Sequence, residues 1–376
     1  MALCSPVPAA SIVVPLFNKA VYILRCLKSI QDQSFSDFEV IVVDDGSTDG
    51  SGTIAAGFCD PRFVVVTQEN RGSGAARNRG IRDARAQLIA FLDADDTWEA
   101  QFLQAIVDLA KRYPEAGVVA TGYRRCLGTG LDKLVTLRNR NADHTLTIDN
   151  YLRVARVGDV VTSSSVGIRA RVLAEAGGFL EGEPFGEDQE LWIRLSLHAP
   201  IAYDTRILAV YHSEASNRMC RALDSKRVRH PAIRSLLELL QQGTITPARR
   251  QQILLHIDWL SINYAVSMLY NCPRSEIEEA MRTVRLFTFR FRTTAFLLRI
   301  ALRVVSPRVL AAIKLKPAAL LATWRQVGAV DRLSSFVEGA LGRTVRTCFV
   351  PTPCPSQGFQ TVTLPPNQPK QSSSAQ

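Results

Sequence analysis

Short β-rich runs alternate with helix-like segments from residue 11 to residue 121, and this alternation constrains the fold more than any other feature. The segments between the runs carry apolar residues at helical spacing, as Val21, Leu24 and Leu27 do. A β-α-β-α rhythm is typical of a mainly parallel sheet with helices on both faces. We therefore predict an α/β fold with a Rossmann-like, doubly wound sheet whose strands span 11–17, 38–43, 62–67, 88–92 and 117–121.

The rest of the chain divides by composition. Residues 122–160 lack a clear period, 160–168 have an extended pattern, and 188–198 have a helical one. Helical patterns dominate from about residue 222, whereas the last residues are rich in Pro, Ser and Gln, a composition typical of disorder. We predict an α/β domain over 1–217, a basic helical C-terminal extension over 218–349 and a disordered tail over 350–376.

Charge is distributed unevenly along the 376 residues. Residues 1–217 carry 22 Lys and Arg against 27 Asp and Glu, whereas 218–376 carry 23 against 8. The segment 280–330 mixes ten Lys and Arg with Phe, Leu and Ile and has no acidic residue, as an interfacial amphipathic segment does. We expect it to bind an anionic membrane surface; a helical cap with solvated Arg is the alternative. Nucleic acid is not an expected partner, because no nucleic-acid motif accompanies the charge.

Cysteine usage and hydropathy indicate the compartment. The eight Cys are scattered and none forms a C-x-x-C motif, so we expect free thiols in a reducing environment. The apolar run at 11–17 is short and follows Pro6 and Pro8, which favours a first strand over a signal peptide. No apolar run approaches the roughly 20 residues that cross a bilayer. We expect a cytoplasmic protein, held at the inner face of the cell membrane where 280–330 binds lipid.

Three carboxylates, Asp93, Asp95 and Asp96, follow the apolar run 88–92 in the stretch AFLDADD. Ionised carboxylates this close repel each other, and a bound cation would offset that repulsion. Carboxylate oxygens suit Mg²⁺ or Mn²⁺, and Mg²⁺ typically takes one or two of them and fills its other positions with phosphate and water. Ligands of open α/β sheets bind beyond the carboxyl ends of the strands. The cluster therefore suits a metal–diphosphate complex; a solvated helix cap is the alternative.

Five motifs that follow one another along the chain resemble those of the family 2 glycosyltransferases. They are SIVVPLFNKA, VIVVDDGSTDGS, ENRGSGAARNRGI, AFLDADD and GEDQELWIRL, and the resemblance covers about residues 8–215. Each motif is weak alone, but five in order are a specific signal. The resemblance implies the GT-A fold and a bacterial-type enzyme that uses a nucleotide-diphosphate sugar, most readily a UDP-sugar, with Mn²⁺ or Mg²⁺ as cofactor.

The resemblance also implies which residues bind the donor. Pro15, Phe17 and Asn18, at the end of the first strand, would line the pocket for the nucleotide base. Asp45, the second Asp of the D-D-G-S motif, would hydrogen-bond the base, although a turn between strand and helix is the alternative role for this motif. Arg77 would lie on a helix that flanks the nucleotide; a surface arginine is the alternative.

The same resemblance implies the metal ligands and the catalytic base. Asp93 and Asp95 match the D-x-D motif, in which Asp95 would bind the metal and Asp93 would reach the ribose or share the metal. His212 falls where some relatives place a further metal ligand, although a lone His is more often structural. Asp188 matches the catalytic base, which takes the proton of the acceptor hydroxyl. Stabilisation of a helix N-terminus is the alternative role for this carboxylate.

One departure from the family narrows the expected reaction. After Asp188 the chain reads QELWIR, which is not the Q-x-x-R-W motif of processive polymerases. The resemblance then implies a non-processive enzyme. We predict inverting, metal-dependent transfer of a single sugar to a hydroxyl acceptor, either a saccharide or a lipid-linked intermediate in cell-surface polysaccharide synthesis.

Two other functions compete with this one. Asp93-x-Asp95-x-Thr97 also fits the nucleophile motif of haloacid-dehalogenase-like phosphatases, but that motif normally opens its domain and needs a downstream Lys and another acidic pair. The basic second half alone would fit a non-catalytic protein that binds an anionic surface.

Overall fold

A computed structural model of the chain describes residues 6–128, 132–137, 143–156, 158–214, 230–241 and 245–271. These residues fall into two compact units. The first combines the described part of Met1–Phe179 with Arg194–Ser216, and the second combines Leu180–Ile193 with the described residues after Asn217. The predicted membrane-binding segment 280–330 and the tail 350–376 lie outside the described residues, so both remain predictions.

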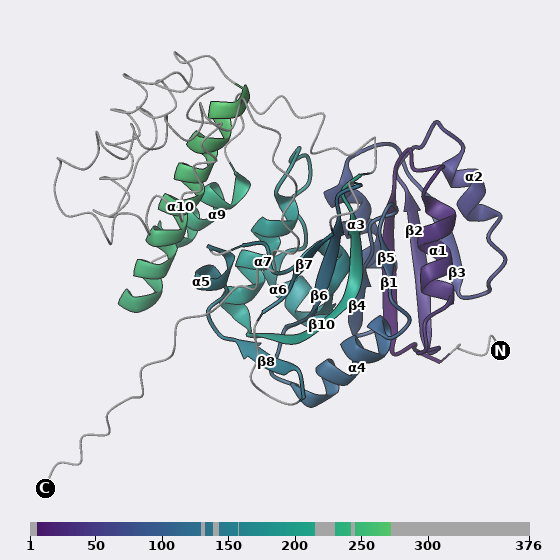
Figure 1. Cartoon of the computed structure of the whole chain (residues 1–376), viewed down its shortest axis with the longest axis horizontal. Helices are drawn as coiled ribbons and strands as arrows, with labels where there is room; N and C mark the ends of the chain where they lie inside the picture. The colour runs from purple at the N-terminus through teal and green to yellow at the C-terminus, as the bar shows by residue number, and fades with distance from the viewer. Residues whose placement is uncertain are drawn as a thin grey trace, which may run out of the picture. The chain divides into compact units, whose positions relative to one another are not determined.

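The first unit is built on a sheet whose strands are mostly parallel (Figure 1). Its strands are β1 (Ala10–Leu16), β2 (Phe38–Asp44), β3 (Phe63–Thr67), β4 (Leu88–Phe91), β5 (Thr97–Trp98), β6 (Val118–Cys126), β7 (Lys133–Val135), β8 (Thr145–Ile148), β9 (Val166–Arg169) and β10 (Ile201–His212). The strand order is β3-β2-β1-β4-β9-β6-β10-β5, with β7 beside β6 and β8 beside β10. The pairs β3-β2, β2-β1 and β1-β4 are parallel, whereas β9 is antiparallel to both of its neighbours.

Helices cover both faces of this sheet. They are α1 (Ile23–Gln31), α2 (Ser51–Ala56), α3 (Ser73–Asp83), α4 (Phe102–Arg112), α5 (Tyr151–Ala155) and α6 (Ala170–Ala176). Because side chains alternate across a strand, Ile12 and Val14 of β1 join one core with α1 and α4, and Val13 points to the opposite face, toward α3. The predicted α/β fold, with a central sheet of mostly parallel strands, is confirmed.

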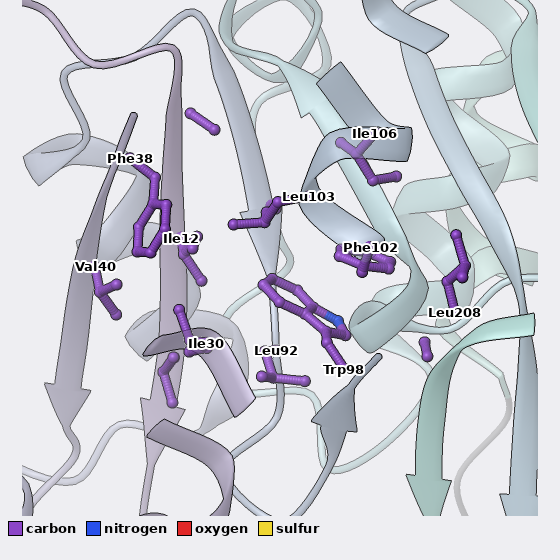
Figure 2. Packing of buried hydrophobic residues seen from close by; sticks show 14 of the residues in the cluster. Ile12, Ile30, Phe38, Val40, Leu92, Trp98, Phe102, Leu103, Ile106 and Leu208 are labelled. Atoms are coloured by element: carbon purple, nitrogen blue, oxygen red, sulfur yellow. The ribbon is translucent and has the colours of Figure 1, made fainter. Parts of the chain in front are cut away.

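The main core joins the segment after β4 to the rest of the unit. Figure 2 shows Ile12 of β1, Ile30 of α1 and Trp98 of β5 within this core. Trp98 stacks on Phe102 with ring centroids 4.1 Å apart and donates its indole N–H to the carbonyl of Ser164 at 2.6 Å. Burying a large apolar side chain contributes about 1.5–3 kcal/mol to the stability of the fold. Trp98 therefore anchors the segment that follows the acidic loop.

A glycine brings α3 close to β1. A Cβ on Gly80 would lie 2.3 Å from Cγ1 of Val13, a distance that no relaxed side chain tolerates. The helix backbone therefore packs directly on the strand, and this contact fixes Arg77, one turn earlier in α3, at the edge of the sheet.

The described part of the second unit combines helices with the non-helical stretch 180–186. Its helices are the first part of α7 (Glu187–His198), α9 (Pro231–Gln241) and α10 (Pro247–Asn271), in agreement with the helical pattern predicted at 188–198 and, within the described residues, with that predicted from residue 222 onward. Within the described part of the chain, none of the helices combines the length and apolar character that a membrane crossing requires.

Candidate active site

The ends of three strands meet at one edge of the sheet. β1 pairs in parallel with β2 on one side and β4 on the other, so the loops that follow these strands are neighbours. The backbone N–H of Asn18 donates to Ser47 Oγ at 3.1 Å, and Asn18 Oδ1 accepts the N–H of Thr48 at 2.8 Å. Asn18 has a φ of 51°, a left-handed conformation that Asn tolerates better than most residues. The loop after β1 is thus tied to the loop after β2.

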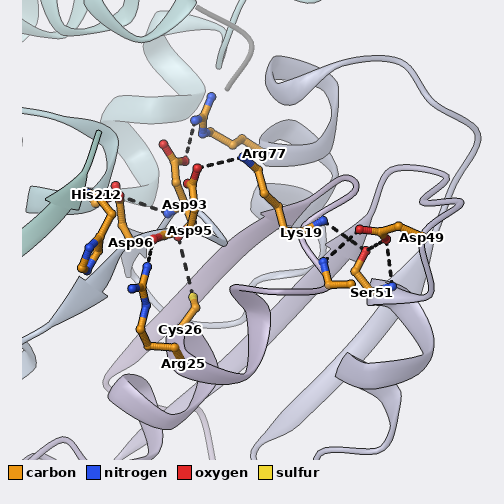
Figure 3. Close-up of polar contacts among 12 residues, drawn as sticks. Lys19, Arg25, Cys26, Asp49, Ser51, Arg77, Asp93, Asp95, Asp96 and His212 are labelled. Atoms are coloured by element: carbon orange, nitrogen blue, oxygen red, sulfur yellow. Dashed lines mark hydrogen bonds and ion pairs between the residues drawn. The ribbon is translucent and has the colours of Figure 1, made fainter. Parts of the chain in front are cut away.

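The acidic loop after β4 is neutralised by two basic side chains from elsewhere in the chain (Figure 3). Lys19 Nζ lies 2.8 Å from Asp95 Oδ2, and Arg77 Nη2 lies 2.7 Å from Asp93 Oδ1. Arg25 donates to the backbone carbonyl of Asp95 at 2.8 Å. The predicted need for positive charge at this cluster is met here by side chains of the protein itself.

Asp96 has a different role from the two aspartates before it. Its side chain is fully buried, and it accepts hydrogen bonds from the Ser164 hydroxyl at 2.6 Å and from the His212 backbone N–H at 2.9 Å. Burial raises the pKa of Asp96 well above its ordinary value, and the charges of Asp95 and Asp93 raise it further. Asp96 therefore ties the acidic loop to Ser164 and to the end of β10, and it is not accessible to a ligand.

The two aspartates at the end of β2, Asp44 and Asp45, both form hydrogen bonds within the protein. Asp44 Oδ1 accepts a backbone N–H three residues further on at 3.0 Å, so Asp44 forms the turn. Asp45 is buried and accepts the backbone N–H groups of Arg71 and Gly72 at 3.0 and 2.8 Å and the side-chain amide of Gln68 at 2.7 Å. Asp45 thus joins β2 to the start of α3, and its contact with a nucleotide base remains a prediction.

Arg77 is held rigidly on α3. Its side chain is buried, and its guanidinium lies 5.2 Å from the ring centroid of Phe179. The adjacent Asn78 donates to the Phe179 carbonyl at 2.9 Å and accepts the Phe179 N–H at 2.8 Å. Gly178, with a φ of 74°, makes room for this contact, because a Cβ there would lie 2.7 Å from Asn78 Oδ1. A buried guanidinium in cation–π contact with an aromatic ring differs from the surface arginine that was the alternative.

The remaining predicted donor residues lie near the end of β1. Pro15 is half-buried and lies opposite Val43 of β2, whereas Phe17 is exposed just beyond the strand. An exposed aromatic ring beside the loops after β1 and β2 is a suitable surface for stacking a base. The roles of Pro15 and Phe17 in donor binding remain predictions.

His212 lies at the end of β10 beside the acidic loop. Its Nε2 is 3.2 Å from Thr97 Oγ1 and its Nδ1 is 2.7 Å from Glu214 Oε1. Both ring nitrogens therefore have protein partners, and one of these hydrogen bonds would have to break for His212 to bind a metal. Its predicted role as a ligand stays a prediction.

Asp188 lies in the first turn of α7, in the second unit. Its Oδ1 accepts the backbone N–H of Gln189 at 2.7 Å. The nearby His230 accepts the Ala232 N–H at Nδ1 (3.2 Å), so the neutral ring carries its proton on Nε2, which lies 2.9 Å from Gln189 Oε1. Gly186 leaves space for this ring, since a Cβ there would lie 2.9 Å from His230 Nε2. His230 thus braces the turn that carries the predicted base.

The environment of His230 predicts a pH-dependent stability. Burial lowers the pKa of His230 from 6.5 to about 4, although the charges of Glu190 and Glu187 oppose the shift. The unfolded chain therefore binds the proton more readily, so stability is complete above pH 6.5 and falls as the pH drops toward 4, by up to about 1.4 kcal/mol per pH unit. Urea unfolding of the wild type and of His230→Gln across this window measures the effect. We expect a steeper loss in the wild type, and parallel profiles would contradict this.

The donor atoms of the acidic loop fit a divalent cation bound to a diphosphate. Within the described ranges, no three His, Cys, Asp or Glu side chains converge as a complete protein metal site. A cation that takes one or two carboxylates and completes its coordination with phosphate and water needs no third protein ligand. Asp93 and Asp95 supply hard oxygen atoms of this kind, and both are now paired with basic side chains.

Three residues of the site make contacts that the motifs do not predict: Lys19, Ser164 and His230. Lys19 stands 76 positions before Asp95, Ser164 68 positions after Asp96, and His230 41 positions after Gln189. Lys19 lies within the motif SIVVPLFNKA, but the motif does not show which carboxylate Lys19 pairs with.

Comparison with known proteins identifies relatives of the first unit. Residues 11–173 match the model of Glycosyl transferase family 2. The chain is 43% identical over 105 residues to the putative glycosyltransferase EpsH of Bacillus subtilis, covering 27% of this chain and 30% of EpsH. It is 34% identical over 156 residues to the putative teichuronic acid biosynthesis glycosyltransferase TuaG of the same organism, covering 40% of this chain and 60% of TuaG. The chain thus spans less than two thirds of the length of both relatives.

Solved structures share the fold. TarS of S. aureus, in complex with UDP-GlcNAc, matches with a TM-score of 0.59 at 19% identity, covering 84% of this chain and 91% of that one. The mannosyltransferase PcManGT of Pyrobaculum calidifontis, in complex with GDP-Man and Mn²⁺, matches with a TM-score of 0.50 at 19% identity, covering 91% and 88%. At such identities the likeness concerns the fold alone. The matched family model and the predicted GT-A fold agree, and the chain carries a glycosyl transferase family 2 domain at residues 11–173.

Proposed function

We propose that this protein transfers a single sugar, with inversion, from a nucleotide-diphosphate sugar to a hydroxyl acceptor in a metal-dependent reaction. One observation carries the proposal: Asp93 and Asp95 follow β4 at the edge where the ends of β1 and β2 meet, and each carboxylate is held by a basic side chain from a different element. The site therefore combines carboxylates for a cation with positive charge for a diphosphate. The family assignment favours this function over a phosphatase or a non-catalytic binder.

The donor is a nucleotide sugar, and we favour a UDP-sugar. Of the two solved neighbours, TarS is in complex with UDP-GlcNAc and PcManGT is in complex with GDP-Man. In this chain the base would lie beside Asp45 and the end of β1, where Phe17 is exposed. Pro15 and Asn18 would complete the base pocket, and Arg77 with Asp93 would border the ribose and diphosphate.

Asp95 and Asp93 would hold Mn²⁺ or Mg²⁺, and His212 is the further candidate ligand. The neighbour solved with GDP-Man also contains Mn²⁺, which supports a divalent ion in this family of folds. A bound divalent ion would neutralise negative charge on the departing diphosphate. Arg77, which lies over Phe179, would keep Asp93 in one orientation while the diphosphate departs.

Asp188 would act as the catalytic base. A carboxylate at this position takes the proton from the acceptor hydroxyl as its oxygen attacks the anomeric carbon from the face opposite the diphosphate. The bond from the anomeric carbon to the diphosphate oxygen breaks in the same displacement, so the anomeric configuration inverts. His230, through Gln189, would keep the first turn of α7 in position.

The acceptor would be a saccharide or a lipid-linked intermediate in cell-surface polysaccharide synthesis. The name of TuaG, which refers to teichuronic acid biosynthesis, is consistent with such an acceptor.

We further propose a cytoplasmic enzyme held at the inner membrane face by residues 280–330. Flotation with anionic vesicles tests whether the protein binds a membrane surface. A protein that does not float with the vesicles would exclude this membrane binding.

A nucleotide-sugar screen tests the proposed function. We expect UDP-sugars to raise the melting temperature when Mn²⁺ or Mg²⁺ is present, and EDTA to remove that stabilisation, because a ligand that binds only the folded protein stabilises it. Release of nucleoside diphosphate in the presence of a saccharide acceptor would then report turnover. If no nucleotide sugar binds with either ion, or if the protein hydrolyses phosphate esters instead, the proposal is wrong.

A further inference from the structure

The two basic side chains that neutralise the acidic loop are held in different ways. Figure 3 shows Arg77 paired with Asp93 and Lys19 paired with Asp95. Arg77 is a rigid partner, because its side chain is only 6% exposed and its planar guanidinium lies over Phe179. The helix that carries it packs against β1 through Gly80. Arg77 has little freedom to leave Asp93.

Lys19 is a movable partner. It lies in the loop after β1, and its backbone N–H forms a long hydrogen bond of 3.4 Å to Ser51 Oγ. Its ammonium group lies 5.9 Å from the ring centroid of Tyr22, near the outer limit of a cation–π contact, which contributes little at this distance. A Lys side chain is a compact charge on a flexible four-carbon stem, and it can move its charge while the backbone stays fixed.

The pair between Lys19 and Asp95 is substantially buried. The exposed fractions of the two side chains are 14% and 6%. A carboxylate in such surroundings needs a positive partner, because an unpaired buried charge is costly. Lys19 Nζ contacts only the Oδ2 atom of Asp95, so a divalent cation on this carboxylate would lie within a few ångströms of the ammonium. Two positive charges this close repel each other, and a bound cation therefore favours departure of Lys19.

From this arrangement, and resting on the proposed function, we infer that Lys19 is a displaceable counter-ion of Asp95. Its ammonium holds the carboxylate in place when the donor is absent. When the divalent ion arrives with a diphosphate, Lys19 releases Asp95 and pairs with a diphosphate oxygen instead. A metal that binds without a diphosphate breaks the pair between Lys19 and Asp95 and leaves Lys19 without a new anionic partner. A metal that binds with a diphosphate gives Lys19 a new partner. Lys19 thus couples metal affinity to nucleotide binding.

Mn²⁺ binding with and without UDP tests this role directly, with free Mn²⁺ measured by electron paramagnetic resonance. We expect Lys19→Met to bind Mn²⁺ alone at least about tenfold more tightly than the wild type, equivalent to about 1.4 kcal/mol. The increase in Mn²⁺ affinity produced by UDP should shrink by about the same factor. Lys28→Met is the matched control, because it removes an equal charge from an exposed position on α1 and should behave as the wild type does.

Two outcomes would overturn the inference in distinguishable ways. If the wild type binds Mn²⁺ with UDP but Lys19→Met binds Mn²⁺ alone no more tightly, only the role of Lys19 is wrong. If the wild type does not bind Mn²⁺ even with UDP, the proposed function is wrong as well. Lys19→Gln serves as a second variant, because its amide can still donate to Asp95 without the charge. The same tightening is expected for it, and circular dichroism confirms that either variant is folded.

Discussion

Asp188→Asn is expected to reduce sugar transfer by about 10²- to 10⁴-fold, the range typical for loss of a general base. The amide cannot accept the proton of the acceptor hydroxyl, although it has nearly the same shape and can still accept the Gln189 N–H. Donor binding should remain close to that of the wild type. The measurement is the initial rate of nucleoside diphosphate release with saturating donor, together with donor affinity from calorimetry.

Glu187→Gln is the matched control for this variant. Glu187 is the neighbouring carboxylate in the same first turn of α7, so its replacement removes an equal charge from the helix N-terminus. We expect Glu187→Gln to retain most of the transfer rate. If Asp188→Asn turns over as fast as the wild type, Asp188 is not the base. Equal losses in the two variants would instead indicate that the charge of the helix terminus is responsible.

Asp95→Asn should abolish metal-dependent nucleotide binding and lower transfer by roughly 10³-fold or more, since a metal that stabilises a departing diphosphate contributes several kcal/mol. An amide oxygen is a weaker ligand than a carboxylate and no longer pairs with Lys19. UDP affinity measured with Mn²⁺ and again with EDTA separates the part of nucleotide binding that needs the metal from the part that does not. We expect the wild type to lose affinity in EDTA and Asp95→Asn to be insensitive to it.

Asp83→Asn is a suitable control for Asp95→Asn. Asp83 pairs with Arg79 on the surface of α3, and an exposed pair of this kind contributes little to stability. It should leave both nucleotide binding and transfer unchanged. Nucleotide binding by Asp95→Asn that still depends on Mn²⁺ would exclude Asp95 as the ligand.

The parallel half of the sheet could be predicted because its central strands, β1, β2 and β4, are buried on both faces. Such strands are nearly continuous apolar runs, as Val40–Val43 and Leu88–Phe91 are. β10 was not predicted, because Asp204, Thr205 and Arg206 interrupt its apolar pattern. The pairing of β10 with β6 shifts register at that point, so a β-bulge absorbs residues that a regular strand would not accommodate.

The candidate site was predictable where one local segment carries the chemistry. Asp93 and Asp95 lie two residues apart after an apolar strand, and no long-range information is needed to notice them. Their partners come from distant elements: Lys19 from the loop after β1 and Arg77 from α3. Which cation reaches which carboxylate depends on strand order and helix packing, and neither can be derived from residue spacing alone.

The most direct test of the central claim is a crystal grown with UDP and Mn²⁺ and measured at a wavelength where manganese scatters anomalously. The acidic loop after β4 should carry an anomalous peak at coordination distance from an Asp95 oxygen, about 2 Å away, with an oxygen of the UDP diphosphate bound to the same ion. Bound UDP at another place, with Asp95 still paired to Lys19, would contradict the account.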